Sequence, residues 1–258
     1  RGCTFRLAGI EDIPFLMKED EIYRANYSIS AFRDEAHWRY MLTEGLITEY
    51  GSEFWIMENK QNSEKKYCRI PEDGFGTGLI ISEISEDISI DALGNLFLFC
   101  KEKALDRDKP YIRLNLHNNS RAGRMAISMG AKEGTPYAWQ IKIPEKALFL
   151  RTIKPILEKR IMASSFSGFS DKFRLNFYKS TVDLIWKNGE LISVKPGQGE
   201  CPFSFSLSDE LFPILSLGYR TWQELRYIKP DIFPNSEGSA LFVETLFPPS
   251  NSWIYEQY

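Results

Sequence analysis

Two alternating apolar runs joined by Asn188-Gly189 constrain the fold of this chain more than any other stretch. Val182, Leu184 and Trp186 occupy every second position before this pair, and a second run, 191–194, follows it. Asn-Gly between two such runs is typical of a type I′ hairpin turn, because both central residues need a positive φ. Residues 173–177 alternate in the same way upstream. We therefore predict an antiparallel β-meander.

The residues on either side of the meander indicate helices. Residues 148–161 keep helical spacing, with Pro155 either bending that helix or starting its second half. From residue 203 onward we expect only helices, with Thr221 opening a capping box and Ser236 capping the last helix. An antiparallel sheet followed by helices is an α+β arrangement.

The first half of the chain alternates between strand and helix patterns. Its last unit runs from 111 to 144 and reads as strand, short helix, glycine and strand, with Gly130 as the helix C-cap and Pro144 ending the final strand. The expected elements are strands at 4–7, 52–58, 78–85, 111–116 and 137–143, a polar loop at 59–66, and helices that begin at 12, 34, 91 and 120.

The overall composition indicates a soluble globular protein. With 258 residues, of which 43% are hydrophobic, the chain is long enough for two ordinary domains of about 100 to 150 residues. The net charge of −3 gives no electrostatic reason to expect nucleic acid or an anionic membrane as partner. The longest apolar run, Leu93 to Cys100, is far shorter than the roughly 20 residues of a membrane span.

Metal binding and export both lack a signal in the sequence. No C-x-x-C pair is present, and only two histidines are available to complete a metal site, so we expect no metal. The first residues lack the apolar segment of a signal peptide, which makes the cytoplasm the expected location. Because the chain begins at Arg1 rather than methionine, we also expect an upstream domain. The cysteines are Cys3, Cys68, Cys100 and Cys201.

Several longer phrases resemble a known family. The unit at 111–144 is similar to the end of a GNAT acyltransferase domain. The connection from such a domain to the C-terminal part of the enhanced intracellular survival acetyltransferases resembles YAWQIKIPEKALFLRTIKPILEKRIMAS in this chain. GELISVKPG, GYRTWQELR and ALFVETLFPPSNSWIYEQY resemble late phrases of sterol carrier proteins. The resemblance implies an α+β fold, with a GNAT-like mixed sheet and helices at 1–145 and a sterol-carrier-protein-like domain at 146–258.

The cofactor motif of that family is replaced in this chain. GNAT domains that bind acetyl-CoA carry a motif similar to R/Q-x-x-G-x-G/A between a strand and a helix. Backbone N–H groups of this motif bind the pyrophosphate. This chain has SEDISIDALGNL, which offers Glu86, Asp87 and Asp91 and a single late glycine, Gly94. Because carboxylates repel phosphate, we expect this domain to bind no cofactor. The glycines of GFGTG precede a strand, so they predict a turn rather than a dinucleotide site.

Few residues indicate catalysis. His37 and His117 are each expected to be surface or cap residues, although either could act as a general base. Glu83 and Glu86 are interpreted as solvated charges. The remaining candidate is Tyr258, because the resemblance implies that the terminal carboxylate acts as a base near the acceptor amine.

The sequence therefore supports one principal hypothesis and two alternatives. The first is that the chain supplies the non-catalytic GNAT-like and sterol-carrier-like domains of an N-acetyltransferase, whose acetyl-CoA binds in an upstream GNAT domain. The alternative is a non-enzymatic module that binds an apolar ligand or assembles a homo-oligomer. A complete enzyme with an unusual acetyl-CoA site is the third.

Overall fold

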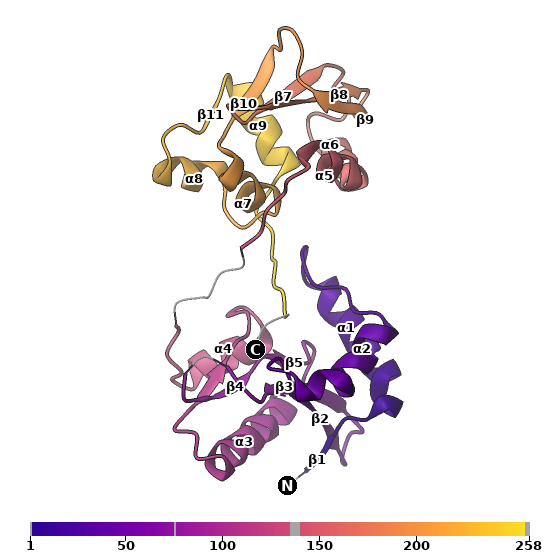
Figure 1. The fold of residues 1–258 in the computed structure, drawn as a ribbon, viewed down its shortest axis with the longest axis vertical. Coiled ribbons are helices and arrows are strands. Elements are labelled where there is room, and N and C mark those ends of the chain that lie inside the picture. Colours follow the sequence, from indigo (N-terminus) through magenta and orange to yellow (C-terminus); the bar gives the residue numbers. More distant parts are fainter. Residues whose placement is uncertain (1, 75, 135–139, 256–258) are drawn as a thin grey trace. The chain divides into compact units, whose positions relative to one another are not determined.

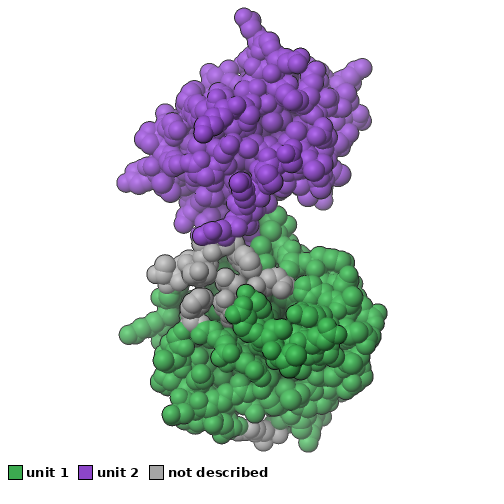
Figure 2. All heavy atoms as spheres, viewed as in Figure 1, with its two compact units in different colours: residues 1–136, 253–258 green, residues 137–252 purple. Residues whose placement is uncertain are grey.

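The chain folds into two units, which Figure 2 colours differently; unit 1 contains two hydrophobic clusters and unit 2 contains one. A computed structural model describes residues 2–74, 76–134 and 140–255. Unit 1 comprises residues 1–136 together with 253–258, and unit 2 comprises residues 137–252.

This division differs from the predicted ranges 1–145 and 146–258 both at the boundary, which lies at 136/137, and at the end of the chain. Residues 253–258 belong to unit 1, because the Tyr255 side chain is buried in the core of that unit. Nothing in the alternation of the last residues predicts where such a segment packs.

Unit 1 contains both strands and helices (Figure 1). Its elements are β1 (Cys3–Leu7), α1 (Ile13–Ala25), α2 (Glu35–Leu42), β2 (Ser52–Asn59), β3 (Lys65–Pro71), β4 (Leu79–Ile81), β5 (Glu83–Ile84), α3 (Ile90–Asp106), β6 (Ile112–Leu114) and α4 (Arg121–Ser128).

The strands of unit 1 form two sheets that share one discontinuous strand. β1, β2, β3 and β5 are antiparallel neighbours in that order, whereas β4 pairs with β6 in parallel. Only Ser82 separates β4 from β5. The segment 79–84 therefore changes its neighbour from β6 to β3 along its length.

Helices pack on both faces of the four-stranded sheet. Phe54 and Ile56 of β2 lie in the core that contains Trp38 of α2, whereas Met57 lies in the core that contains Leu96 of α3. Successive side chains of a strand point to opposite faces, so β2 is buried on both sides.

Side-chain caps fix where the helices of unit 1 begin. Asp34 accepts a hydrogen bond from the His37 N–H at the start of α2. Ser89 and Ser120 accept bonds at 3.2 and 3.1 Å from backbone N–H groups at the starts of α3 and α4. Each cap satisfies one N–H group that has no partner within the helix.

Unit 2 is an α+β layer. Its elements are α5 (Lys146–Thr152), α6 (Lys154–Met162), β7 (Lys172–Asn176), β8 (Thr181–Lys187), β9 (Glu190–Pro196), β10 (Phe203–Ser206), α7 (Phe212–Ser216), α8 (Trp222–Ile228), β11 (Phe233–Pro234) and α9 (Glu237–Leu246).

The meander predicted in unit 2 is confirmed. β7, β8 and β9 pair in antiparallel order, and Asn188 and Gly189 have φ angles of 50° and 79° at the turn. Thr221 and Glu224 form the expected capping box. Pro155 stands in the first turn of α6 and starts that helix.

Aromatic side chains fill the space between the sheet and α9. The Phe242 ring lies 4.7 Å from Phe173 and 5.8 Å from Trp186, measured between ring centroids. Phe166 and Phe169 contact the same ring at 5.0 and 4.6 Å. This packing forms the centre of the unit 2 core.

Three sequence predictions about elements are wrong. The expected loop 59–66 ends where β3 begins at Lys65, and β10 and β11 follow residue 203, where only helices were expected. β10 is a strand because it pairs in parallel with β7, which is a long-range contact. Of the strand expected at 137–143, residues 140–143 have no regular structure, and 137–139 lie outside the described residues.

Candidate functional site

The strand break at Ser82 opens a space within unit 1. On the side of β4 that faces β6, the Asn115 N–H donates to the Ile81 carbonyl. After Ser82 the chain continues as β5, which pairs with β3. Ile84, Leu116 and Ala122 line the space together with Tyr255. Tyr255 is 4% exposed, and the room that remains beside it is too small for a water molecule.

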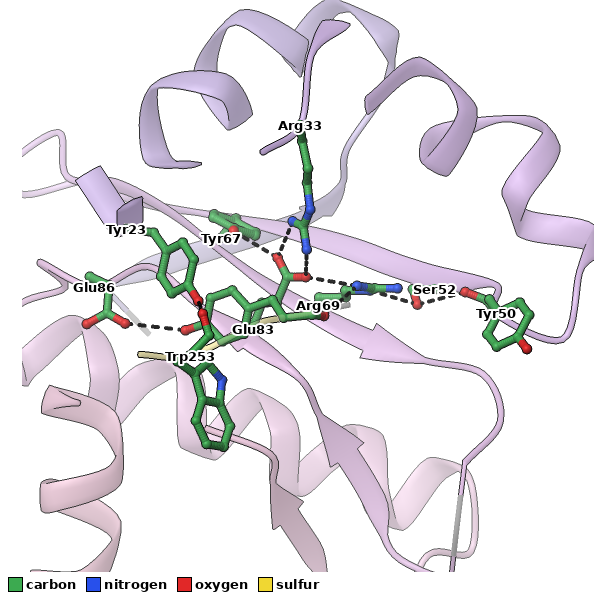
Figure 3. A network of polar contacts seen from close by, with 10 residues as sticks. Tyr23, Arg33, Tyr50, Ser52, Tyr67, Arg69, Glu83, Glu86 and Trp253 are labelled. Carbon is green, nitrogen blue, oxygen red and sulfur yellow. Dashed lines mark hydrogen bonds and ion pairs between the residues drawn. The ribbon is translucent and has the colours of Figure 1, made fainter. Parts of the chain in front are cut away.

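The segment 253–255 enters this space and is held by main-chain contacts. The Trp253 N–H donates to the Ile29 carbonyl at 3.1 Å, and the Trp253 carbonyl accepts from the Tyr23 hydroxyl. The Tyr255 carbonyl accepts from Arg69 Nη1 at 3.3 Å. Figure 3 shows Tyr23, Arg69 and Trp253 among these residues.

A buried ion cluster adjoins the segment. Arg33 Nη1 and Nη2 donate to the two Glu83 oxygens at 2.9 and 2.7 Å, and Arg69 Nη1 donates to Oε1 at 2.8 Å. The Tyr67 hydroxyl adds a fourth bond at 3.0 Å. Arg69 Nε also donates to Ser52 Oγ at 2.9 Å. Ser52 and Glu83 together therefore hold the guanidinium that contacts the segment (Figure 3).

The electrostatics of this cluster hold Glu83 as an anion. Burial raises the pKa of the Glu83 carboxyl, but the charges of Arg33 and Arg69 outweigh burial and lower the pKa to about 2. A carboxylate with this pKa and four donors is a poor proton acceptor near neutral pH. Its role is to position Arg69.

Glu86 has the opposite character. Its Oε1 accepts from the Tyr27 hydroxyl at 2.8 Å and from the Tyr255 hydroxyl at 3.4 Å. Burial raises the pKa of its carboxyl, and the two hydroxyls offset that effect only in part. Burial also raises the pKa of Tyr255. Of the two glutamates, Glu86 is therefore the better proton acceptor.

The start of α3 is occupied by a carboxylate of the chain itself. Glu64 accepts from the Ser89 N–H at 2.7 Å and from the Ser89 hydroxyl at 2.6 Å. Burial raises the pKa of Glu64, but these bonds outweigh burial and lower it. Asp87 forms an ion pair with Lys66. The region where a pyrophosphate would need N–H donors thus carries Glu64, Glu86 and Asp87, and it does not fit acetyl-CoA.

The residues singled out in the sequence are dispersed. His117 lies beside the Trp253 ring at 5.6 Å, and burial lowers its pKa. His37 lies on α2, where its N–H is capped by Asp34. Tyr258 lies outside the described residues. Among the residues that the structure describes, no three His, Cys, Asp or Glu side chains gather to hold a metal ion.

The interpretation of Glu83 as a solvated charge is wrong, since its side chain is 0% exposed. A signal was available, because Glu83 stands in the apolar run LIISEI, and a buried carboxylate requires a cation. Arg69 also occupies a strand, in KKYCRIP, but Arg33 lies in an irregular segment with no periodic pattern. Only the fold brings these two arginines to one carboxylate.

Comparisons with known proteins identify the fold. No protein-family model and no curated protein matches the chain. The crystal structure of a GCN5-related N-acetyltransferase from Kribbella flavida matches 100% of this chain at 11% identity and a TM-score of 0.59. The chain spans 60% of the length of that structure.

Shorter structures resemble part of the chain. A predicted acetyltransferase with acetyl-CoA from Clostridium acetobutylicum matches 53% of this chain and 94% of its own length, at 16% identity and a TM-score of 0.39. That score is too low to support an argument. The first similarity shows that the chain has the α+β fold of a GCN5-related N-acetyltransferase.

Proposed function

We propose that the chain supplies two non-catalytic domains of a GNAT-type N-acetyltransferase of the enhanced intracellular survival class. Unit 1 is the GNAT-like domain and does not hold acetyl-CoA, and unit 2 is the sterol-carrier-like domain. The enzyme transfers an acetyl group from acetyl-CoA to an amine, and the cofactor binds in a GNAT domain upstream of residue 1.

The observation that carries this proposal is the contact between Glu64 and Ser89. A helix N-terminus attracts anions because its first N–H groups lack partners and carry partial positive charge. At α3 the Glu64 carboxylate already takes that place, at 2.7 Å from the Ser89 nitrogen. A pyrophosphate would have to displace it and then lie close to Glu86 and Asp87, which are acidic as well.

The alternative of an apolar ligand in unit 2 has less support. The rings around Phe242 already occupy the space between the sheet and α9, and a lipid would have to displace them. Opening a cavity large enough for a lipid in a packed core is costly in free energy. The same packing supports a role for unit 2 as a rigid structural domain.

Isothermal titration with acetyl-CoA tests the proposal. We expect no saturable heat for the unaltered chain, because the carboxylates repel the pyrophosphate. Glu64→Ala removes one of them and should raise any residual affinity, whereas Glu58→Ala on the exposed side of β2 should not. Saturable micromolar binding by the unaltered chain would instead support a complete enzyme with an unusual cofactor site.

The role of Tyr258 stays a proposal within this enzyme. Its α-carboxyl group would act as a base near the acceptor amine, although the reference pKa of about 3.5 makes it a weak one. Three extended residues span at most about 11 Å, so the acceptor would have to approach Tyr255 within that distance. Removing residue 258 from the full-length enzyme should lower kcat about 100-fold with the KM for acetyl-CoA unchanged. An unchanged kcat would exclude the role.

A further inference from the structure

The contacts around Trp253–Tyr255 have the form of a peptide-recognition site. Three of them involve main-chain atoms of the segment: the Trp253 N–H, the Trp253 carbonyl and the Tyr255 carbonyl. Main-chain hydrogen bonds of this kind bind an extended peptide irrespective of its sequence, and side-chain pockets then provide specificity.

The side-chain contacts of the segment are made by its aromatic rings. The Tyr255 ring stacks on Tyr23 with centroids 4.2 Å apart and planes at 22°, and its hydroxyl reaches Glu86. The Trp253 ring meets His117 edge to face at 5.6 Å. Aromatic pairs in such arrangements contribute beyond the area they bury. The two pockets are two residues apart, which is the spacing of side chains on one face of an extended chain.

Two of the residues that contact the segment, Arg69 and Glu86, also have partners elsewhere in unit 1. Arg69 is fixed by Ser52 and Glu83, and Glu86 is fixed by Tyr27. Because these two side chains are held on the side away from the segment, binding costs less ordering of the site.

We propose that unit 1 contains a peptide-binding groove for an extended segment with aromatic residues at positions i and i+2, and that Trp253–Tyr255 occupies it in cis. The segment follows α9 through residues 248–252. A tether of this length gives a local concentration in the millimolar range, so the groove is blocked in the unaltered chain. Glu86 occurs in both proposals, but this one does not rest on the one on acetyl-CoA, because none of these contacts involves Glu64 or Ser89.

Fluorescence anisotropy with a labelled peptide of residues 250–258 tests this groove. The full chain carrying Trp253→Ala and Tyr255→Ala should bind the peptide saturably, about 100-fold or more tightly than the unaltered chain does. A peptide of the same length with alanine in place of Trp253 and Tyr255 should not bind. Adding Tyr23→Phe to the double variant should weaken binding about 5- to 10-fold, because it removes the hydroxyl that reaches the Trp253 carbonyl but keeps the ring.

Two results would overturn the proposal. One is a double variant that melts cooperatively yet shows no binding at about 1 mM peptide, a concentration near the expected tether value. The other is equal binding of the alanine peptide. If the double variant does not fold, a protease site placed within 248–252 of the otherwise unaltered chain provides the test. After cleavage the folded protein should take up the labelled peptide, and failure to take it up would reject the groove.

Discussion

At the scale of single residues, the most consequential group in unit 1 is Glu83. Its carboxylate binds Arg33, Arg69 and Tyr67, and it is excluded from solvent. Two buried guanidinium groups around one carboxylate are tolerated only while the carboxylate stays charged. Glu83 therefore controls both the stability of unit 1 and the position of the Arg69 donor.

Glu83→Gln should destabilise unit 1 strongly. Breaking a buried ion pair on one side costs about 3–5 kcal/mol, because it leaves the partner charges without compensation. Urea denaturation followed by circular dichroism measures the loss. Glu35→Gln removes an exposed partner of Arg39 and serves as the matched control, with no measurable shift of the midpoint expected. Equal midpoints for the two variants would contradict the central role of Glu83.

The same variant should change the dependence of stability on pH. The folded pKa of Glu83, about 2, lies below the unfolded value of about 4.3. The cluster therefore contributes its full stability above the unfolded pKa and loses it as the pH falls toward 2. The decline between these values should be smaller in Glu83→Gln than in the unaltered chain.

At the scale of elements, turn chemistry was the most reliable guide. Asn188-Gly189 predicted the β8–β9 hairpin, and the capping box at Thr221 predicted the start of α8, because both signals act over a few neighbouring residues. β3 was missed because its first residues, Lys65 and Lys66, read as loop. Lys66 is buried and pairs with Glu19 and Asp87, and this pairing is set by distant parts of the chain.

Three glycine variants can separate the causes that fix the hairpin. Gly189 has a φ of 79°, and an added Cβ would lie 2.3 Å from the Ser167 carbonyl oxygen. Gly199 has a φ of 61° but open space around it, and Gly168 has open space without a positive φ. We expect Gly199→Ala to cost about 1–2 kcal/mol from backbone strain alone, Gly189→Ala to cost more, and Gly168→Ala to cost little. Thermal unfolding measures all three. A loss at Gly189 no larger than at Gly199 would exclude the steric contribution.

At the scale of the whole molecule, each unit buries its own hydrophobic residues, and Tyr255 is buried with those of unit 1. Within the described ranges, no helix has the length and apolar character needed to cross a bilayer. The similarity to the Kribbella flavida structure extends over the full chain, although almost nine residues in ten differ. The fold is therefore shared at very low sequence identity, and in this chain the loop before α3 carries Glu86 and Asp87.

The sequence by itself determined the α+β class, most helices of both units, the β-meander and the acidic character of the loop before α3, because these follow from periodicity, caps, turns and charge within a few neighbouring residues. The tertiary structure decided the rest. Contacts between residues far apart in the chain determine three features: the parallel pairing of β10 with β7, the bonds of Arg33 and Arg69 to Glu83, and the buried position of Tyr255. Local patterns cannot encode such contacts, because their free energy arises only when the whole fold brings the partners together and excludes water from them.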